Sequence, residues 1–237
     1  MEKFITNFDT TAELAIFSAT TDFGKPHVSL TEDDSKVHYF EDPYNGHEYV
    51  DLGLPSGTKW ATMNVGASSE TDYGNYYQYG KGASQYAETS GDSNYSGTED
   101  PLDSSVDTAV QVWGGQGHRP TRAQMQELID NTTYQWVTNY KNSGINGGTF
   151  TAPNGAVLFL PAAGQLIHGN PSSVGSGGYY WGSSPSESEI YMACDLFFYD
   201  NSDDSEYGKT VGNFYRNYGN SVRPVVGIIQ PIPNQSN

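Results

Sequence analysis

The segment that decides the fold is a short, mostly apolar run with Asp195 in its middle and Tyr199 at its end, Met192-Ala193-Cys194-Asp195-Leu196-Phe197-Phe198-Tyr199. Successive side chains of a β-strand point to opposite faces of the sheet. A strand here therefore places Leu196 and Phe198 on one face, and Asp195, Phe197 and Tyr199 on the other. We assign Leu196 and Phe198 to the core, so the other face is expected to be aromatic and accessible.

The residues around this strand are rich in tyrosine. Residues 179–218 hold seven of the 18 tyrosines of the chain, namely Tyr179, Tyr180, Tyr191, Tyr199, Tyr207, Tyr215 and Tyr218. Tyrosine offers a large amphipathic contact area with few rotatable bonds, and Ser, Asn and Gly add adaptable hydrogen bonding, as in antibody loops. Two interpretations remain: a binding surface, or the ordinary core of the last strands.

Upstream, one helix and one hairpin are predicted. Thr121 is placed to cap a helix over 122–129, with Met125, Leu128 and Ile129 on one face. Residues 149–151 and 156–161 are expected to pair around Pro153-Asn154-Gly155, and the second of these strands is apolar enough to be central. Residues 46–57 predict a strand followed by a turn, and 221–229 predict a further buried strand.

Segments outside these elements are less regular. Residues 1–45 show short alternating runs, such as 27–30 and 37–40, and predict two or three strands of an attachment arm. Residues 84–106 are rich in Ser, Gly, Asp and Thr, which favours a long surface excursion. The expected organisation is an arm at 1–45, a ligand-binding domain at 46–227 and a tail at 228–237.

Composition excludes several classes of function. The chain of 237 residues has 28 acidic against 11 basic residues, a net charge of −17, so neither nucleic acid nor an anionic membrane is an expected partner. Cys194 is the only cysteine, which excludes an intrachain disulfide. No apolar run approaches a membrane span, and the first residues do not resemble a signal peptide, so membrane insertion is not expected.

Several motifs follow one another in the order of a known domain family. The opening string is Tyr49-Val50-Asp51-Leu52-Gly53-Leu54-Pro55-Ser56-Gly57-Thr58-Lys59-Trp60-Ala61. Later pieces are Leu102-Asp103, Trp113-Gly114-Gly115, Arg119-Pro120-Thr121, Glu127-Leu128, 159–164, 179–184 and 221–225. Together they resemble the Fibrobacter succinogenes major paralogous domain, which is abundant in Bacteroidetes.

The resemblance implies an α+β fold, the C-type-lectin-like fold of the formylglycine-generating-enzyme type, in which the N- and C-terminal strands pair and variable loops are displayed. Some proteins with this ending are variable proteins of diversity-generating retroelements, which rewrite adenines before the terminal strand. The corresponding variable region is about 179–220. Asn codons rewritten at adenine never yield Trp, Met, Gln, Lys or Glu, so Trp181, Glu187, Glu189, Met192, Glu206 and Lys209 are expected to be fixed.

The expected ligand-binding positions are those in the variable region whose residue types this chemistry permits. They are Ser186, Tyr191, Cys194, Asp195, Phe197, Tyr199, Asn201, Asp203, Tyr207, Asn213, Tyr215, Asn217 and Tyr218. Trp181 and Arg223 are expected to be scaffold residues beside them.

Catalysis and metal binding are not expected. A lone Cys194 lacks the second cysteine that the oxidase of this fold type needs, and the five histidines show no metal-hydrolase spacing. Asp200, Asp203, Asp204 and Glu206 crowd one loop and have oxygen ligands that suit calcium, but the Glu-Pro-Asn and Trp-Asn-Asp triplets of calcium-dependent lectins are missing. We expect a solvated acidic loop and no cofactor, with calcium as the alternative.

The function expected from these features is non-enzymatic display of a binding surface. The leading hypothesis is a phage tail-fibre or receptor-binding protein, made in the host cytoplasm and carried in the virion, that recognises a protein or glycan on a host or neighbouring cell. Residues 1–45 would dock to virion or tail components, and a homotrimer would suit a fibre tip. The alternatives are a bacterial cell-surface or secreted adhesin, and an accessory module of a carbohydrate-active system.

Overall fold

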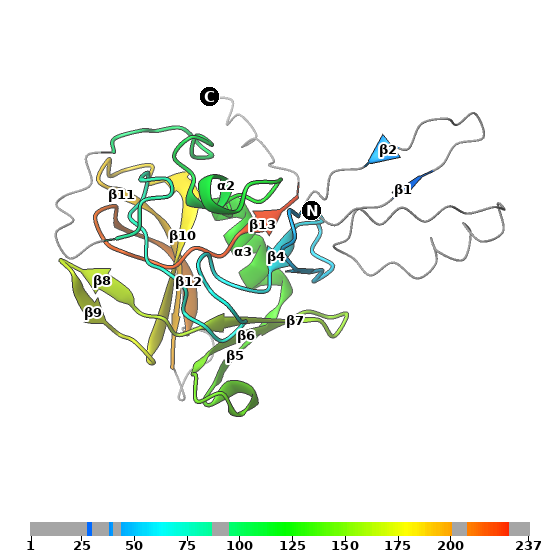
Figure 1. Cartoon of the computed structure of the whole chain (residues 1–237). Helices are drawn as coiled ribbons and strands as arrows, with labels where there is room; N and C mark the ends of the chain where they lie inside the picture. The colour runs from blue at the N-terminus through cyan, green and yellow to red at the C-terminus, as the bar shows by residue number, and fades with distance from the viewer. Residues whose placement is uncertain (1–27, 30–37, 40–43, 87–94, 201–207, 228–237) are drawn as a thin grey trace, which may run out of the picture.

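Short antiparallel strands and a few short helices make up the computed structural model, which describes residues 28–29, 38–39, 44–86, 95–200 and 208–227 (Figure 1). The first part contains β1 (Val28–Ser29), β2 (His38–Tyr39), β3 (Tyr49–Val50), β4 (Lys59–Ala61), α2 (Thr108–Trp113) and α3 (Arg122–Asn131). The second part contains β5 (Thr133–Val137), the 3-10 turn η1 (Tyr140–Asn142), β6 (Gly147–Thr151), β7 (Val157–Pro161), β8 (Gln165–Ile167), β9 (Asn170–Ser172), β10 (Gly177–Pro185), β11 (Met192–Tyr199), β12 (Lys209–Tyr215) and β13 (Val225–Val226). The protein is therefore mainly β with few helices.

The predicted helix is confirmed as α3. The side chain of Thr121 accepts a hydrogen bond from the backbone N–H of Gln124, and the Gln124 side chain accepts one from the Thr121 N–H, which completes a capping box. Met125 and Leu128 are fully buried, and Ile129 packs against the same cluster. Through this apolar face α3 packs against β10, β11 and β12.

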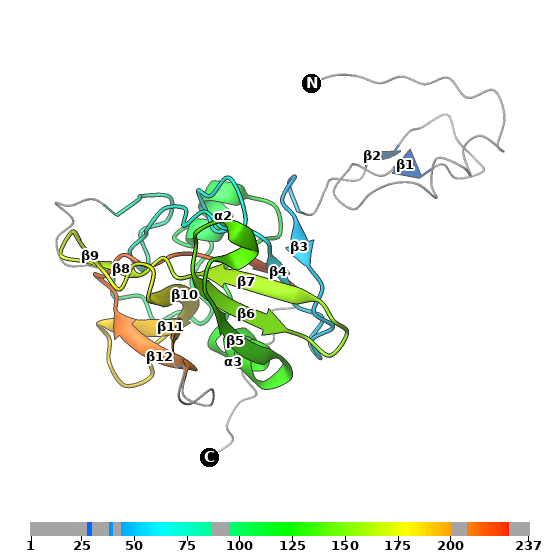
Figure 2. The same ribbon diagram turned by 90° about the horizontal axis from the view of Figure 1, so that it is seen from below.

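The predicted hairpin is confirmed as β6 and β7, but the prediction that β7 is central is wrong. The strand order is β5-β6-β7, so β6 lies in the middle (Figure 2). A Cβ atom on Gly148 of β6 would lie 2.7 Å from the ring of Tyr134 and 3.1 Å from the ring of Phe198. The central strand is therefore glycine-rich because bulky neighbouring rings cross it, and apolar content alone did not mark the centre.

The decisive strand, β11, is the middle of a second antiparallel sheet, β10-β11-β12. Its register places Trp181 of β10 and Gly212 of β12 on either side of Asp195, and Tyr179 and Thr210 on either side of Phe197. The hairpin β8–β9 lies beside this sheet (Figures 1 and 2), and Leu166 of β8 bridges to Gly219. A β-strand at 192–199 is thus confirmed.

A third sheet, β3-β4-β13, joins distant parts of the chain. Val225 pairs with Trp60, and Tyr49 pairs with Ala61. This agrees with the expected pairing of N- and C-terminal strands of the domain. The strand predicted over 221–229 is regular over β13, and residues 221–226 are buried; residues 228 and 229 lie outside the described residues.

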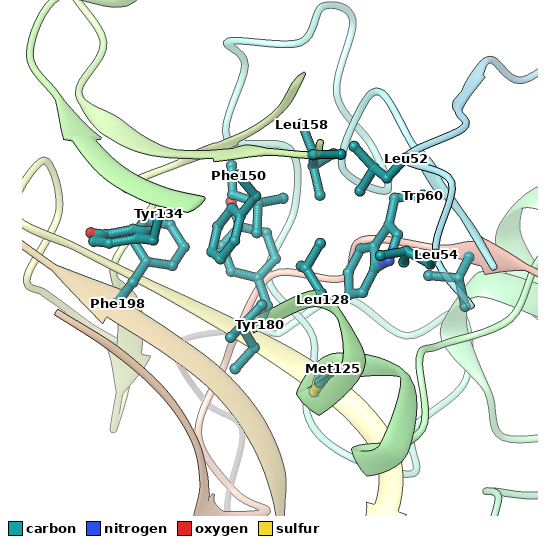
Figure 3. Packing of buried hydrophobic residues seen from close by; sticks show 14 of the residues in the cluster. Leu52, Leu54, Trp60, Met125, Leu128, Tyr134, Phe150, Leu158, Tyr180 and Phe198 are labelled. Atoms are coloured by element: carbon teal, nitrogen blue, oxygen red, sulfur yellow. The ribbon is translucent and has the colours of Figure 1, made fainter. Parts of the chain in front are cut away.

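Two clusters of buried side chains form the core. The first lies between α3, the β5-β6-β7 sheet and one face of β11, and brings Tyr134, Phe150, Tyr180 and Phe198 together (Figure 3). The second cluster contains Tyr77, Tyr79, Trp181, Ala193 and Val222 among others, and covers part of the opposite face of β11. The sheet β10-β11-β12 is therefore packed on both faces over part of its length.

Two segments differ from expectation. The short helix α2 was not predicted; Asp107 caps it by accepting from the backbone N–H of Ala109 at 2.8 Å. The excursion over 84–106 is not purely a surface loop, because Leu102 is buried and its N–H donates to the Ser183 carbonyl at 2.9 Å. Residues 87–94 of that excursion lie outside the described residues.

The N-terminal arm is described at residues 44 and 45 and at β1 and β2, which pair antiparallel through Val28 with Tyr39 and Ser29 with His38. These two strands fall in the segments where short strands were predicted. The remaining residues of the arm lie outside the described part of the chain. Among the described residues, no helix is both long and apolar enough to span a bilayer.

Candidate functional site

The expected ligand-binding residues lie mainly on β11, β12 and the turns beside them. Ten of the thirteen can be described: Ser186, Tyr191, Cys194, Asp195, Phe197, Tyr199, Asn213, Tyr215, Asn217 and Tyr218. The other three, Asn201, Asp203 and Tyr207, lie outside the described residues, as do Asp204 and Glu206 of the acidic loop.

The two faces of β11 behave as the alternation predicted. Leu196 and Phe198 are fully buried in the first core cluster, whereas Phe197 is half-buried and Tyr199 is 39% exposed. Burial on the second face falls off along the strand, because Ala193 and Asp195 are covered by the second cluster and Tyr199 is not. This face is therefore accessible only toward the C-terminal end of β11.

Aromatic side chains cover that accessible end, in a group we name the sheet aromatics: Tyr179, Phe197, Tyr199 and Phe214. The ring of Phe197 stacks on Tyr179 at 6.1 Å and on Tyr199 at 6.2 Å, with interplanar angles of 14° and 13°. Phe214 meets Tyr179 and Phe197 edge-on, at 5.3 Å and 5.5 Å. Rings held against one another in this way have little rotamer freedom to lose when a ligand binds.

A second group, the turn aromatics, consists of Tyr191, Tyr215 and Tyr218. Tyr191 stacks on Tyr215 with 5.9 Å between ring centroids, and Tyr215 lies 5.5 Å from Tyr218. Tyr191 and Tyr215 are 53% and 44% exposed. A hydrogen bond with the Glu189 carboxylate raises the pKa of the Tyr191 hydroxyl.

Three of the expected surface residues are buried, so their assignment to the accessible surface is wrong. Cys194 shares the core face with Leu196, and a Cβ atom on the neighbouring Gly182 would lie 2.2 Å from its sulfur. Asp195 is covered because Asn220 returns over it, and Ser186 is held at a turn where its hydroxyl accepts from the Glu189 N–H at 3.2 Å. Burial raises the pKa of the Cys194 thiol to about 11.

The remaining expected residues take part in the surface through hydrogen bonds. Asn213 is exposed and its side-chain oxygen accepts from the Arg122 guanidinium at the start of α3. The carbonyl of Asn217 accepts from the Gln78 side chain at 3.1 Å. Trp181 and Arg223, expected as scaffold, are both fully buried.

A positioning role for arginine was missed by the sequence reasoning. Arg216, next to Tyr215, is buried and donates to the carbonyls of Met192 at 2.9 Å, Tyr95 at 3.1 Å and Gly97 at 2.9 Å. Its guanidinium also lies 4.9 Å from the ring centroid of Tyr79. Arg216 thereby ties the turn aromatics to the 95–97 segment, and nothing in the local sequence distinguishes it from an exposed arginine.

Arg223 holds the other side of this region. It donates to the Asn64 side-chain oxygen at 2.7 Å and to the Ala61 carbonyl at 2.9 Å. Burial lowers its pKa to about 10, against the opposing effect of the Tyr180 hydroxyl. The Trp181 indole N–H donates to the Tyr77 carbonyl at 2.8 Å, so the scaffold beneath the aromatic groups is fixed by buried polar contacts.

Metal-ligating side chains do not gather in the described part of the chain: no group of three or more His, Cys, Asp or Glu residues there could hold a metal ion. Of the acidic loop considered for calcium, Asp200 lies within that part and is exposed, whereas Asp203, Asp204 and Glu206 lie outside it. In the comparisons with known proteins, no family model, no curated protein and no solved structure matches the chain.

Proposed function

We propose that this protein is a ligand-binding display protein whose sheet aromatics and turn aromatics together recognise another macromolecule. The observation that carries the proposal is the distribution of exposed rings. Within residues 44–86, 95–200 and 208–227, the exposed large aromatic side chains are Tyr191, Tyr199 and Tyr215, and all lie on β11, β12 or the turn before β11. Exposed tyrosines gathered in one region are typical of protein recognition surfaces, where tyrosine is a frequent hot spot.

The architecture supports display as well. The aromatic rings stand on a sheet that is packed on both faces over part of its length, and buried hydrogen bonds of Arg216 fix the adjoining turn. A rigid support lowers the entropy lost on binding. The fold that we propose is the C-type-lectin-like fold implied by the sequence resemblance; the pairing of β4 with β13 and the combination of short sheets with α2 and α3 are compatible with it.

The biological setting that we propose is a phage tail fibre or receptor-binding protein that contacts a host of the Bacteroidetes. The sequence resemblance carries this part, with variation at the exposed positions of residues 179–220 altering the ligand. Binding requires no catalytic group in this reading, and recognition depends on shape, apolar contact and hydrogen bonding by phenol groups.

The test is binding of fluorescently labelled protein to a panel of Bacteroidetes strains. We expect saturable binding to at least one strain, and at least a ten-fold loss of affinity when Tyr191 and Tyr215 are both replaced by Ser. The matched control replaces Val157 and Val174, which are 41% and 45% exposed outside the aromatic surface, by Ser and should bind like the unmodified protein. Equal affinity of the tyrosine variant, or no binding to any strain, would contradict the proposal.

A further inference from the structure

A buried carboxyl group lies beside the sheet aromatics, on the same face of β11. Asp195 is two residues from Phe197 on β11, and it is fully buried between Trp181 and Gly212. Its Oδ2 accepts one hydrogen bond, from the side-chain N–H of Asn220 at 2.6 Å. Asn220 is itself fixed, because its backbone exchanges hydrogen bonds with Tyr77 at 3.0 Å and 3.1 Å.

Each of the two side chains leaves one oxygen without a hydrogen-bond partner. Asp195 Oδ1 and Asn220 Oδ1 are both buried, and neither has a hydrogen-bond partner among the described atoms. Both are oxygens, so they cannot bond to each other while the carboxyl group is ionised. A single proton on Asp195 Oδ1 supplies the donor that this pair of atoms lacks.

The surroundings do not favour a charged carboxylate. The titratable and charged side chains on the packed elements include Cys194 and Tyr199 on β11, Tyr179 and Tyr180 on β10, Lys209 and Tyr215 on β12, Arg119 just before α3 and Arg122 at its start, Tyr77 and Tyr79 on the preceding loop, and Arg216, Tyr218 and Arg223 on the returning segment. Burial raises the pKa of Asp195 well above the ordinary value, opposed by the Asn220 hydrogen bond, and a charge on Asp195 would also raise the pKa of the neighbouring Cys194 thiol. An isolated charge at such a site is strongly disfavoured.

We infer that Asp195 is protonated at neutral pH and donates from Oδ1 to Asn220 Oδ1, which closes a reciprocal two-bond pair. The proton is taken up from solvent during folding, and no covalent bond changes. The pair fixes the segment from Arg216 to Asn220, which carries Tyr218 and follows Tyr215. Asp195 is thus a positioning residue of the aromatic surface, a role that rests on the proposed function, whereas the protonation itself does not.

The sign of the pH dependence follows from the raised pKa. The stabilisation is complete below the unfolded-state pKa of about 3.8 and is lost as the pH rises through the folded-state value. Between those two values the ratio of folded to unfolded protein falls about ten-fold per pH unit for this one group. Asp195→Asn, a neutral isostere that keeps an acceptor and gains a donor, removes that dependence.

The experiment compares urea unfolding of the whole chain and of its Asp195→Asn variant from pH 4 to pH 8, with Asp130→Asn at an exposed carboxyl as the control. As the pH rises, we expect the folded-to-unfolded ratio of the Asp195→Asn variant to increase relative to that of the unmodified protein by about ten-fold per pH unit. The stability of Asp130→Asn should follow the same pH dependence as that of the unmodified protein. Parallel curves for Asp195→Asn, or its failure to fold, would overturn the proposal.

A second measurement reports the proton directly. The infrared carbonyl band of a protonated carboxyl group should be present at pH 7 and absent from Asp195→Asn; absence from both proteins would also overturn the inference. The positioning role is tested with the labelled-cell assay, where Asp195→Ala should weaken binding and Asp195→Asn should restore it. Because the unfolding and infrared measurements need no ligand, their failure is distinguishable from failure of the proposed function.

Discussion

Replacing Phe198 by alanine is expected to destabilise the protein severely, whereas replacing its neighbour Tyr199 is expected to cost little. Phe198 is fully buried, and its ring lies 6.0 Å from Tyr134, 6.0 Å from Phe150 and 5.9 Å from Tyr180. Tyr199 points to the opposite face and is 39% exposed. The pair therefore compares the two faces of one strand at adjacent positions.

The expected losses of unfolding free energy differ several-fold between the two substitutions. Removing a buried phenylalanine ring costs about 3–5 kcal/mol, because the transfer free energy is lost and a cavity remains. For a domain of this size that corresponds to a fall in Tm of about 6–20 °C. Tyr199→Ala loses mainly the stacking on Phe197, worth about 1 kcal/mol, since the Tyr199 carbonyl still accepts from the Tyr134 hydroxyl at 2.9 Å.

Urea unfolding, monitored by circular dichroism and by tryptophan fluorescence, measures the loss of unfolding free energy for each variant. Transitions that coincide in the two signals establish two-state unfolding. A loss at Tyr199 as large as that at Phe198 would refute the assignment of the faces and make the sheet aromatics part of the core. A loss below about 1 kcal/mol at Phe198 would refute the packing shown in Figure 3.

Two further predictions concern buried polar groups. Because burial raises the pKa of the Cys194 thiol to about 11, a thiol reagent at pH 8 should label the folded protein only as fast as it unfolds; immediate labelling without denaturant would contradict the burial of the sulfur. Asp107→Ala removes the α2 cap, the acceptor of the Arg119 N–H at 2.9 Å and the countercharge 3.8 Å from Arg119 Nε. It should cost about 3–5 kcal/mol in urea unfolding. Asp107→Asn keeps an acceptor and removes only the charge, so it should cost less; equal losses would show that the charge, rather than the hydrogen bonds, accounts for the stabilisation.

Local sequence patterns were sufficient to predict helix α3, the β6–β7 hairpin and the faces of strand β11. The Thr121 and Gln124 side chains cap α3 within four residues, and the Pro153–Gly155 turn joins two adjacent strands. The alternation of β11 gave the correct faces for Leu196, Phe198 and Tyr199. In each case the determining contacts come from neighbouring residues or from a two-residue period.

The predictions of side-chain burial failed where contacts with segments distant in the sequence determine that burial. Asp195 lies on the same face as Tyr199, and only the return of Asn220, 25 residues later, buries it. Cys194 was placed at the surface by codon chemistry, although its position on β11 puts it with Leu196. Arg216 is buried because the 95–97 segment supplies carbonyl acceptors, a contact over 119 residues or more that no local pattern encodes.

The pairing of β4 with β13 also bears on how the protein is made. Trp60 and Val225 are partners, so when a ribosome has synthesised only the first two thirds of the chain, one edge of β4 still presents open backbone donors and acceptors. Closure of that edge must wait for the last strand, and contacts of such long sequence separation form slowly. The β3-β4-β13 sheet of a nascent chain is therefore incomplete until residues 225 and 226 have been synthesised and have left the ribosome.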